Sequence, residues 1–132
     1  MADRVRFSVT DAATVDGAYD VVTAFECVHD LPDPVSVLAA MRRLAGPDGI
    51  VLVVDERVAE QFTAPGDDVE RLMYGYSLTC CLPDGLSTRP SVGTGTVMRP
   101  ATLEGYAREA GFAGAETLPI NNDFFRFYRL VA

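Results

Sequence analysis

The sequence contains no lysine, and this absence limits the partners that the chain can attract. All 11 basic residues are arginines, against 19 acidic residues, so the formal net charge is −8 at pH 7. The arginines are scattered, and no basic run compensates locally for the acidic excess. A chain with this charge balance is repelled by the phosphates of nucleic acids and by anionic membranes. We therefore expect neither nucleic acid nor a membrane as a partner.

Long apolar stretches and metal-binding or disulfide patterns are also lacking. No apolar stretch approaches the roughly 18 residues of a membrane span, and the N-terminus has no signal-peptide core, which predicts a cytoplasmic protein. Cys27, Cys80 and Cys81 form no C-x-x-C pair, and His29 is the only histidine. This set predicts neither a zinc site nor a disulfide framework. We interpret the cysteines as small, buried apolar side chains.

Apolar residues, 48% of the 132, are instead arranged in short periodic segments that predict one α/β domain over residues 1–132. Alternation predicts a strand over 4–9, and a nearly continuous apolar run predicts a strand over 19–25 that is covered on both faces. Asp33 and Pro34 are typical of a helix start, and the helix is expected to end at Gly46. A second buried strand follows and should be parallel to the first.

The second half of the chain has weaker signals. Helical spacing extends over 67–82, although a glycine and a β-branched residue weaken it. Residues 83–95 form a long loop that is a candidate lid or substrate-side wall, with a disordered segment as the alternative. A short helix is predicted over 99–112. The runs on either side of the turn at 121–123 predict a terminal β-hairpin.

Charged and titratable side chains follow both of the apolar strands in the first half. Glu26, His29 and Asp30 come after the first strand, and Asp55 and Glu56 end the second. Because the carboxyl ends of parallel strands meet at one edge of a sheet, and ligands bind there in open α/β folds, these five residues should gather in one place. Neighbouring acids on a strand are nevertheless expected to diverge, which argues against a metal site.

Four short motifs occur in a telling order: "YDVV" at 19–22, "VHD" at 28–30, "PDG" at 47–49 and "REAGF" at 108–112. Over nearly its whole length the chain thus resembles the C-terminal part of class I S-adenosylmethionine-dependent methyltransferases. The resemblance implies a partial Rossmann-like sheet. Of the family's seven strands, in the order 3-2-1-4-5-7-6, this chain would supply the third to the seventh, ending in an antiparallel hairpin. It also implies methyl transfer from S-adenosylmethionine to a small molecule.

The resemblance assigns candidate site residues. Asp11 and Ala12 would meet the adenine of the cofactor, and Phe25 and Glu26 would line the pocket near its sulfonium, a cation that a carboxylate stabilises. His29 is the candidate general base toward an acceptor hydroxyl, since its pKa lies near working pH. The alternatives are a cap at Asp11, a solvated acid at Glu26 and a packing role for His29. The topology suggests further residues as substrate contacts: Asp30, Tyr74, Tyr76, Asn122 and Asp123.

Two cofactor-binding features of the family are missing, namely the glycine-rich turn after the first strand and the ribose-binding acid after the second. We therefore expect a truncated methyltransferase domain. The strand at 19–25 would then have a bare edge, which the segment 4–9 or a second copy of the chain would cover. We favour a homodimer through this edge.

Three hypotheses about function follow. The chain is either part of a small-molecule methyltransferase, weak or inactive alone, or a catalytically inactive dimeric binding module of the same fold. A nicotinamide-using enzyme is the third, but it needs the same missing glycine-rich turn. A serine hydrolase is disfavoured because no Gly-x-Ser-x-Gly elbow is present.

Overall fold

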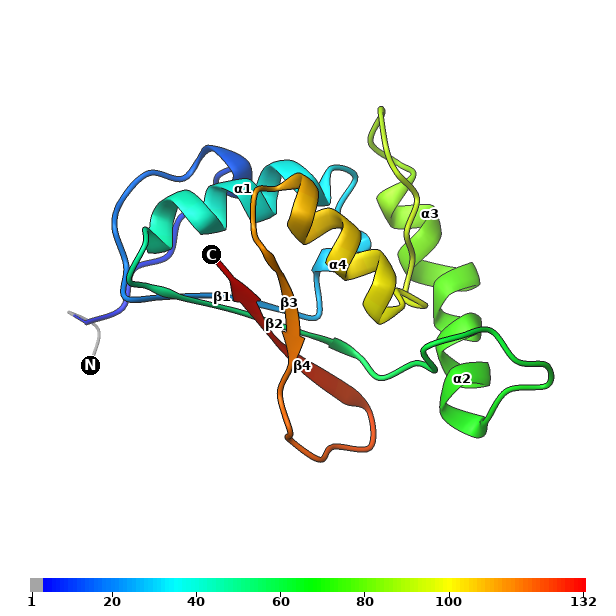
Figure 1. The fold of residues 1–132 in the computed structure, drawn as a ribbon. Helices are drawn as coiled ribbons and strands as arrows, with labels where there is room; N and C mark the ends of the chain where they lie inside the picture. Colours follow the sequence, from blue (N-terminus) through cyan, green and yellow to red (C-terminus); the bar gives the residue numbers. More distant parts are fainter. Residues whose placement is uncertain (1–3) are drawn as a thin grey trace.

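The computed structural model describes residues 4–132 and contains a mixed four-stranded sheet (Figure 1). In chain order the elements are η2 (Ala12–Thr14), β1 (Val21–Phe25), η3 (Val28–Asp30), α1 (Pro34–Ala45), β2 (Ile50–Glu56), α2 (Asp68–Tyr76), η4 (Ser77–Cys81), α3 (Leu82–Gly85), α4 (Pro100–Glu109), β3 (Gly114–Thr117) and β4 (Phe125–Val131). The strand order is β1-β2-β4-β3, with β1 parallel to β2 and β4 antiparallel to both neighbours. This confirms the predicted α/β class and terminal hairpin, and it matches the 4-5-7-6 part of the family order.

The strand predicted over 4–9 does not form. These residues are exposed, and Phe7 and Val9 keep nearly all of their accessible surface. In the family order the third strand pairs with the second, and residues 4–132 contain no such neighbour, so the segment has no ladder to join. It does not move beside β1 either, and β1 remains the outer strand of the sheet in the described chain.

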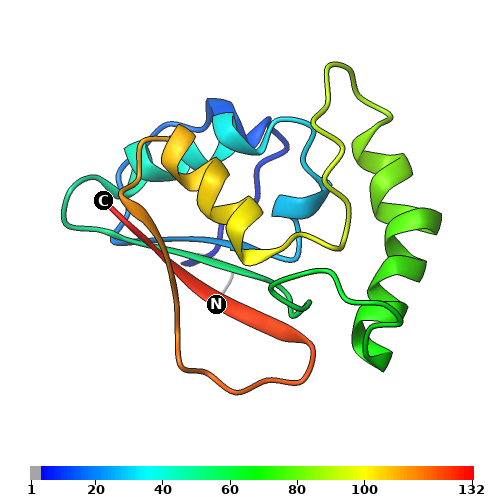
Figure 2. The same cartoon turned by 45° about the vertical axis from the view of Figure 1, so that its right-hand side comes forward.

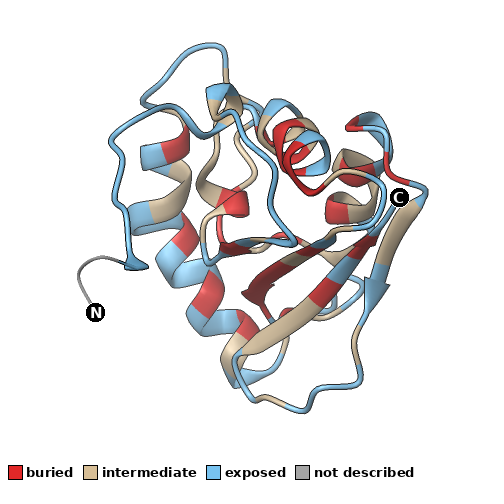
Figure 3. Cartoon of the chain, turned by 90° about the vertical axis from the view of Figure 1, so that its left-hand side faces the viewer, coloured by how far each residue is buried: buried red, intermediate tan, exposed pale blue. Residues whose placement is uncertain are grey.

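The β1-α1-β2 crossover forms as predicted. The backbone N–H of Ser36 donates to the Asp33 carboxylate (3.0 Å), Pro34 lies in the first turn, and Gly46 ends the helix with φ of 65°. Leu38 of α1 and Val53 of β2 are both fully buried and belong to the same hydrophobic core. Figure 3 shows that buried positions concentrate between the sheet and the helices above it.

Only one face of the sheet is covered. Helices α1 and α4 lie on the same face, and the views in Figures 1 and 2 agree that no helix of residues 4–132 lies on the other. On that second face Val21 and Phe25 are 50% and 59% exposed. The prediction that the strand at 19–25 is covered on both faces is therefore wrong, because no element within residues 4–132 packs on the second face.

The helix predicted over 67–82 forms in three pieces at one end of the sheet (Figure 2). Helix α2 begins after Asp67, which accepts a hydrogen bond from the backbone N–H of Glu70 (2.7 Å). The wider π-helical turn η4 follows, and the Thr79 hydroxyl donates to the carbonyl of Gly75 at this junction (2.8 Å). A π-turn rotates the side chains that follow it, and such turns are frequent at functional sites.

The predicted lid at 83–95 is partly helical and is tied to η3. Its first residues belong to α3, and farther on the N–H of Gly95 donates to the carbonyl of His29 (3.0 Å). The C-terminal end of this segment is thus hydrogen-bonded to η3 beside His29. Among residues 4–132, no helix has the length and apolar character needed to cross a bilayer.

Candidate active site

A cavity of about 460 Å³ lies at the carboxyl ends of β1 and β2. Its wall contains five of the residues singled out in the sequence, which are Glu26, His29, Asp30, Glu56 and Tyr76. The other lining residues are Leu72, Met73, Cys81, Thr96, Phe124 and Phe125. The cavity therefore has a polar, acidic floor at the sheet edge and an apolar, partly aromatic wall from α2 and the β3–β4 loop.

Glu26 forms the sharp turn that leads from β1 into the cavity. Its N–H still donates to the carbonyl of Val54 (2.8 Å), while its own φ is 52°, the only positive value for a non-glycine residue in the described chain. Such a conformation costs of order 1–3 kcal/mol and is concentrated at functional sites. Burial and the nearby Glu56 raise the pKa of the Glu26 carboxyl.

His29 is held by three carboxylates. Its side chain is 2% exposed, and its Nδ1 lies 2.5 Å from Oδ1 of Asp55 and 3.0 Å from Oε2 of Glu56. Its Nε2 lies 3.2 Å from Oδ1 of Asp30. Burial opposes the charged ring, but the contacts with Asp55 and Glu56 outweigh it and raise the pKa of His29 to about 11. The resting ring is therefore protonated near neutral pH.

Asp55 and Glu56 converge on one ring nitrogen, which corrects the expectation that adjacent acids diverge. The expectation holds inside a regular strand, but β2 ends at Glu56, and the N–H of Glu56 donates to Oδ1 of Asp55 (3.0 Å). The chain then turns at Arg57, whose N–H donates to the carbonyl of Phe124 (2.7 Å). The end of the strand thus lets both carboxylates reach the same cation.

Several buried oxygens around the cavity have no hydrogen-bond partner among the described residues. They are Oδ1 of Asp30, Oδ2 of Asp55, Oε2 of Glu56 and Oγ1 of Thr96; the first and third lie near His29, at 3.2 and 3.0 Å, but make no hydrogen bond to it. When ionised, the three carboxylates can accept hydrogen bonds but not donate them, and none of the described residues that line the cavity is an arginine. The site therefore favours a ligand that carries positive charge or donates hydrogen bonds.

The predicted adenine-side residues lie outside this cavity. Asp11 precedes η2 and accepts a hydrogen bond from the N–H of Ala13 (2.9 Å), and Asp11 lines a second cavity with Leu31 and Asp33. Ala12 lies in η2, and the side chain of Phe25 is exposed on the bare face of the sheet. The cap at Asp11 is thus present, and cofactor roles for Asp11, Ala12 and Phe25 remain predictions.

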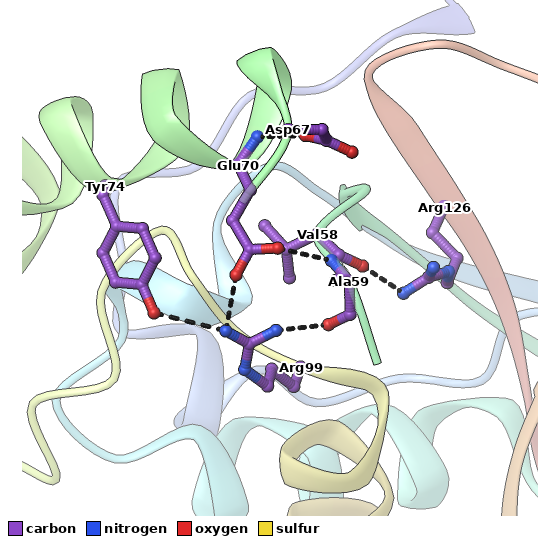
Figure 4. Close-up of polar contacts among 7 residues, drawn as sticks. All are labelled: Val58, Ala59, Asp67, Glu70, Tyr74, Arg99 and Arg126. Atoms are coloured by element: carbon purple, nitrogen blue, oxygen red, sulfur yellow. Dashed lines mark hydrogen bonds and ion pairs between the residues drawn. The ribbon is translucent and has the colours of Figure 1, made fainter. Parts of the chain in front are cut away.

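Three of the predicted substrate contacts have other surroundings. The Tyr74 hydroxyl accepts a hydrogen bond from Arg99 (3.2 Å), as Figure 4 shows. Oδ1 of Asn122 accepts from the N–H groups of Phe124 and Phe125 and shapes the β3–β4 loop. Asp123 is exposed in the same loop. None of the three lines the cavity, so their contact with a substrate remains a prediction.

The sequence did not identify Cys81, Thr96, Met73 or the Phe124–Phe125 pair as site residues. Met73 lies within the helix predicted over 67–82, but the π-helical turn that brings Cys81 to the cavity leaves no periodic signal. The interpretation of all cysteines as buried is wrong for Cys80, which is exposed, while Cys27 and Cys81 are half-buried.

Comparisons with known proteins agree with this architecture. A family model described as "Methyltransferase domain" matches residues 2–117. Ubiquinone biosynthesis O-methyltransferases from Methylococcus capsulatus and Thiobacillus denitrificans are both 32% identical to this chain, over 80% and 92% of its length. The matches cover 41% and 48% of those relatives, so the chain spans less than half of their length.

Solved structures show the same fold. TnmH superposes with a TM-score of 0.74 at 21% identity, over 99% of this chain and 36% of that one. The O-methyltransferase NcsB1 from neocarzinostatin biosynthesis, in complex with S-adenosyl-L-homocysteine and 1,4-dihydroxy-2-naphthoic acid, superposes with a TM-score of 0.63 at 22% identity, over 95% and 33% of the two chains. Both matches cover nearly all of this chain.

Proposed function

Since the chain belongs to the class I S-adenosylmethionine-dependent methyltransferases, we propose that it forms the acceptor side of an O-methyltransferase for a small hydroxylated molecule. The observation that carries this proposal is the group formed by His29, Asp55 and Glu56 at the floor of a cavity beside Glu26. The relatives support the choice of oxygen as acceptor, since both are named O-methyltransferases.

The cavity fits the methyl-donor end of the cofactor. S-adenosylmethionine, when bound, supplies an electrophilic methyl group on a positively charged sulfur. Glu26 and Glu56 face the cavity with negative charge, which stabilises a cation there. The described chain has no glycine-rich turn after a first strand to hold the nucleotide, so we expect cofactor binding by this chain alone to be weak.

His29 is suited to take the acceptor proton at Nε2. Asp55 holds Nδ1 and fixes the orientation of the ring, which leaves Nε2 toward Asp30 and the cavity. A second positive charge in the cavity lowers the proton affinity of the imidazolium, because like charges repel. His29 then passes its Nε2 proton to the carboxylate of Asp30, whose Oδ1 lies 3.2 Å away, and accepts the proton of the acceptor hydroxyl at the vacated nitrogen.

The acceptor is expected to be neutral and partly apolar. Leu72, Met73 and Phe125 provide apolar contact area, and the acidic floor repels a carboxylate on the acceptor. Tyr76 lines the same wall and presents a hydroxyl group. A small molecule with an aromatic or aliphatic body and a hydroxyl group satisfies both parts of the cavity.

A comparison of S-adenosylmethionine with S-adenosylhomocysteine tests the cofactor site, because only the first carries the sulfonium charge. We expect the chain to bind both weakly in calorimetric titrations, and Glu26→Gln to weaken only S-adenosylmethionine, by roughly fivefold for an exposed charge pair. Glu60→Gln, at an exposed acid outside the cavity, is the matched control and should change neither.

The alternative, a catalytically inactive module of the same fold, predicts a defined oligomer and no heat with either compound. Equal weakening of both compounds by Glu26→Gln would contradict the charge-pair role and indicate a structural effect of the substitution.

We also infer that the chain forms a homodimer through the edge of β1. Val21 and Phe25 of this outer strand are exposed on the bare face, and the outer N–H and C=O groups of β1 have no partner strand in the described chain. An apolar edge of this kind pairs with another strand unless a charge blocks it. Light scattering should report a dimer, and Val21→Lys should shift it toward monomer.

Thr117→Lys is the control for this substitution, since it adds the same charge to β3 at the opposite edge of the sheet. It should leave the dimer intact. Dissociation by Thr117→Lys, or an unchanged dimer with Val21→Lys, would place the interface elsewhere.

A further inference from the structure

Three side chains of different chemistry meet beside the cavity. The imidazole of His29, the carboxylate of Asp30 and the thiol of Cys81 each offer one ligand atom, and these atoms lie within 4.8 Å of one another. His29 and Asp30 come from η3 and Cys81 from the π-helical turn η4. Helix α3, which directly follows η4, packs closely on η3. A Cβ at Gly85 of α3 would lie 3.0 Å from the carbonyl oxygen of Asp30.

The ring of His29 is oriented as in many metal sites. Its Nδ1 lies 2.5 Å from Oδ1 of Asp55, and the opposite nitrogen, Nε2, lies 3.2 Å from Oδ1 of Asp30. Histidines that bind metals usually donate the N–H of the other ring nitrogen to a carboxylate, which fixes the tautomer and makes the ligand nitrogen a better donor. Asp55 is placed for this role, since it is 1% exposed.

An independent observation concerns Thr96. This residue is 1% exposed and lines the cavity, and its Oγ1 has no hydrogen-bond partner among the described residues. Oδ1 of Asp30 is also buried without a hydrogen bond. A buried polar group without a partner costs about 1–3 kcal/mol, and a ligand that meets it removes that cost.

The donor set selects the kind of ligand. Mg²⁺ and Ca²⁺ prefer oxygen atoms alone, whereas nitrogen, thiolate sulfur and carboxylate oxygen together suit Zn²⁺. Three protein ligands also leave the fourth tetrahedral position open, as in zinc sites that exchange ligands. We propose that His29, Asp30 and Cys81 bind Zn²⁺ beside the cavity, with Asp55 orienting the imidazole.

Zinc binding has a consequence for the proposed reaction. The metal occupies Nε2 of His29, which is the atom that would accept the proton of the acceptor hydroxyl. A bound Zn²⁺ therefore inhibits methyl transfer at this site. The zinc site does not depend on the methyltransferase proposal, because its ligands and its measurement involve neither cofactor nor acceptor.

Co²⁺ is the first probe, because it takes the place of Zn²⁺ and a cobalt–thiolate bond gives a charge-transfer absorption. We expect titration of the purified chain with Co²⁺ to produce this band and Zn²⁺ to abolish it by displacement. Cys81→Ser should remove the band. Cys80→Ser is the matched control, since its thiol is adjacent in sequence but exposed, and it should leave the band unchanged.

Asp55→Asn tests the orienting carboxylate and should weaken Zn²⁺ binding by about 10–100-fold with the cobalt–thiolate band retained. Far-ultraviolet circular dichroism establishes that each variant is folded; if Cys81→Ser is not, Asp30→Asn is used and should weaken binding at least tenfold. Absence of the band from the wild-type chain, or its persistence in Cys81→Ser, overturns the proposal. Loss of S-adenosylmethionine binding with the band intact would count only against the proposed function.

Discussion

Replacing Arg99 with methionine is expected to lower the free energy of unfolding by about 3–5 kcal/mol, the range for removing one partner of a buried ion pair. Arg99 precedes α4, and its guanidinium contacts the Glu70 carboxylate of α2 at 2.6 Å (Figure 4). The Glu70 side chain is 2% exposed, so Arg99→Met leaves a carboxylate in the interior without its counter-charge. Arg99 also donates to the carbonyl of Ala59 (2.5 Å), a bond that methionine cannot make.

Urea unfolding followed by circular dichroism measures this loss, and Arg108→Met provides the comparison. Arg108 pairs with Glu104 on the surface of α4, where the two side chains are 61% and 44% exposed. An exposed pair of this type contributes roughly 0.3–0.5 kcal/mol. Similar losses for the two variants would show that burial of Glu70 does not control the contribution of Arg99.

A double variant separates the ion pair from the packing. Arg99→Met combined with Glu70→Met removes both charges, so no carboxylate is left unpaired, and part of the lost stability should return. The remaining deficit reports the hydrogen bonds that both side chains make to Ala59 and the one that Arg99 donates to Tyr74. A double variant that is no more stable than Arg99→Met would contradict the ion-pair explanation.

Gly49→Ala is expected to destabilise the chain by about 3 kcal/mol, the upper part of the usual range for inserting atoms into a packed site. Gly49 lies between α1 and β2, and a Cβ there would overlap the backbone carbonyl of Ala45. Backbone atoms at the end of a helix cannot rotate aside as a side chain does. The crossover that positions β2 beside β1 must therefore distort.

Gly105→Ala makes the same chemical change in α4, where a Cβ would meet no atom within 4 Å. Alanine is favoured over glycine in a helix by about 1 kcal/mol, so this variant should be more stable than the wild type. Thermal unfolding of Gly49→Ala and Gly105→Ala, each compared with the wild type, measures both stability changes. A mild effect of Gly49→Ala would mean that the turn before β2 relaxes easily.

Local signals in the sequence were sufficient for the crossover and the hairpin. Asp33 and Pro34 mark the start of α1, and Gly46 marks its end. Capping, a fixed proline φ and a positive glycine φ are local effects, so these ends can be predicted without knowing what the helix packs on. The gathering of Glu26, His29 and Asp55 at one edge followed from the direction of parallel strands alone. These predictions did not depend on the rest of the domain.

The wrong predictions concern features that depend on distant partners. The segment 4–9 has the alternation of a strand, but a strand needs a neighbour, and none is present for it in the described chain. The apolar pattern of β1 likewise predicts a second covered face, and only packing decides whether one exists. The π-helical turn that brings Cys81 to the cavity is missed for a different reason: it is a local widening of one continuous helical segment, and the 3.6-residue spacing of the sequence does not reveal it.

The sheet with one covered face has a colloidal consequence. Copies of a chain with a net charge of −8 repel one another at low ionic strength, whereas their bare apolar faces attract at short range. The Debye length falls from about 30 Å at 0.01 M salt to about 3 Å at 1 M, so added salt removes the repulsion and leaves the attraction. Added salt is therefore expected to promote self-association of this chain, and dilute buffer to keep its copies apart.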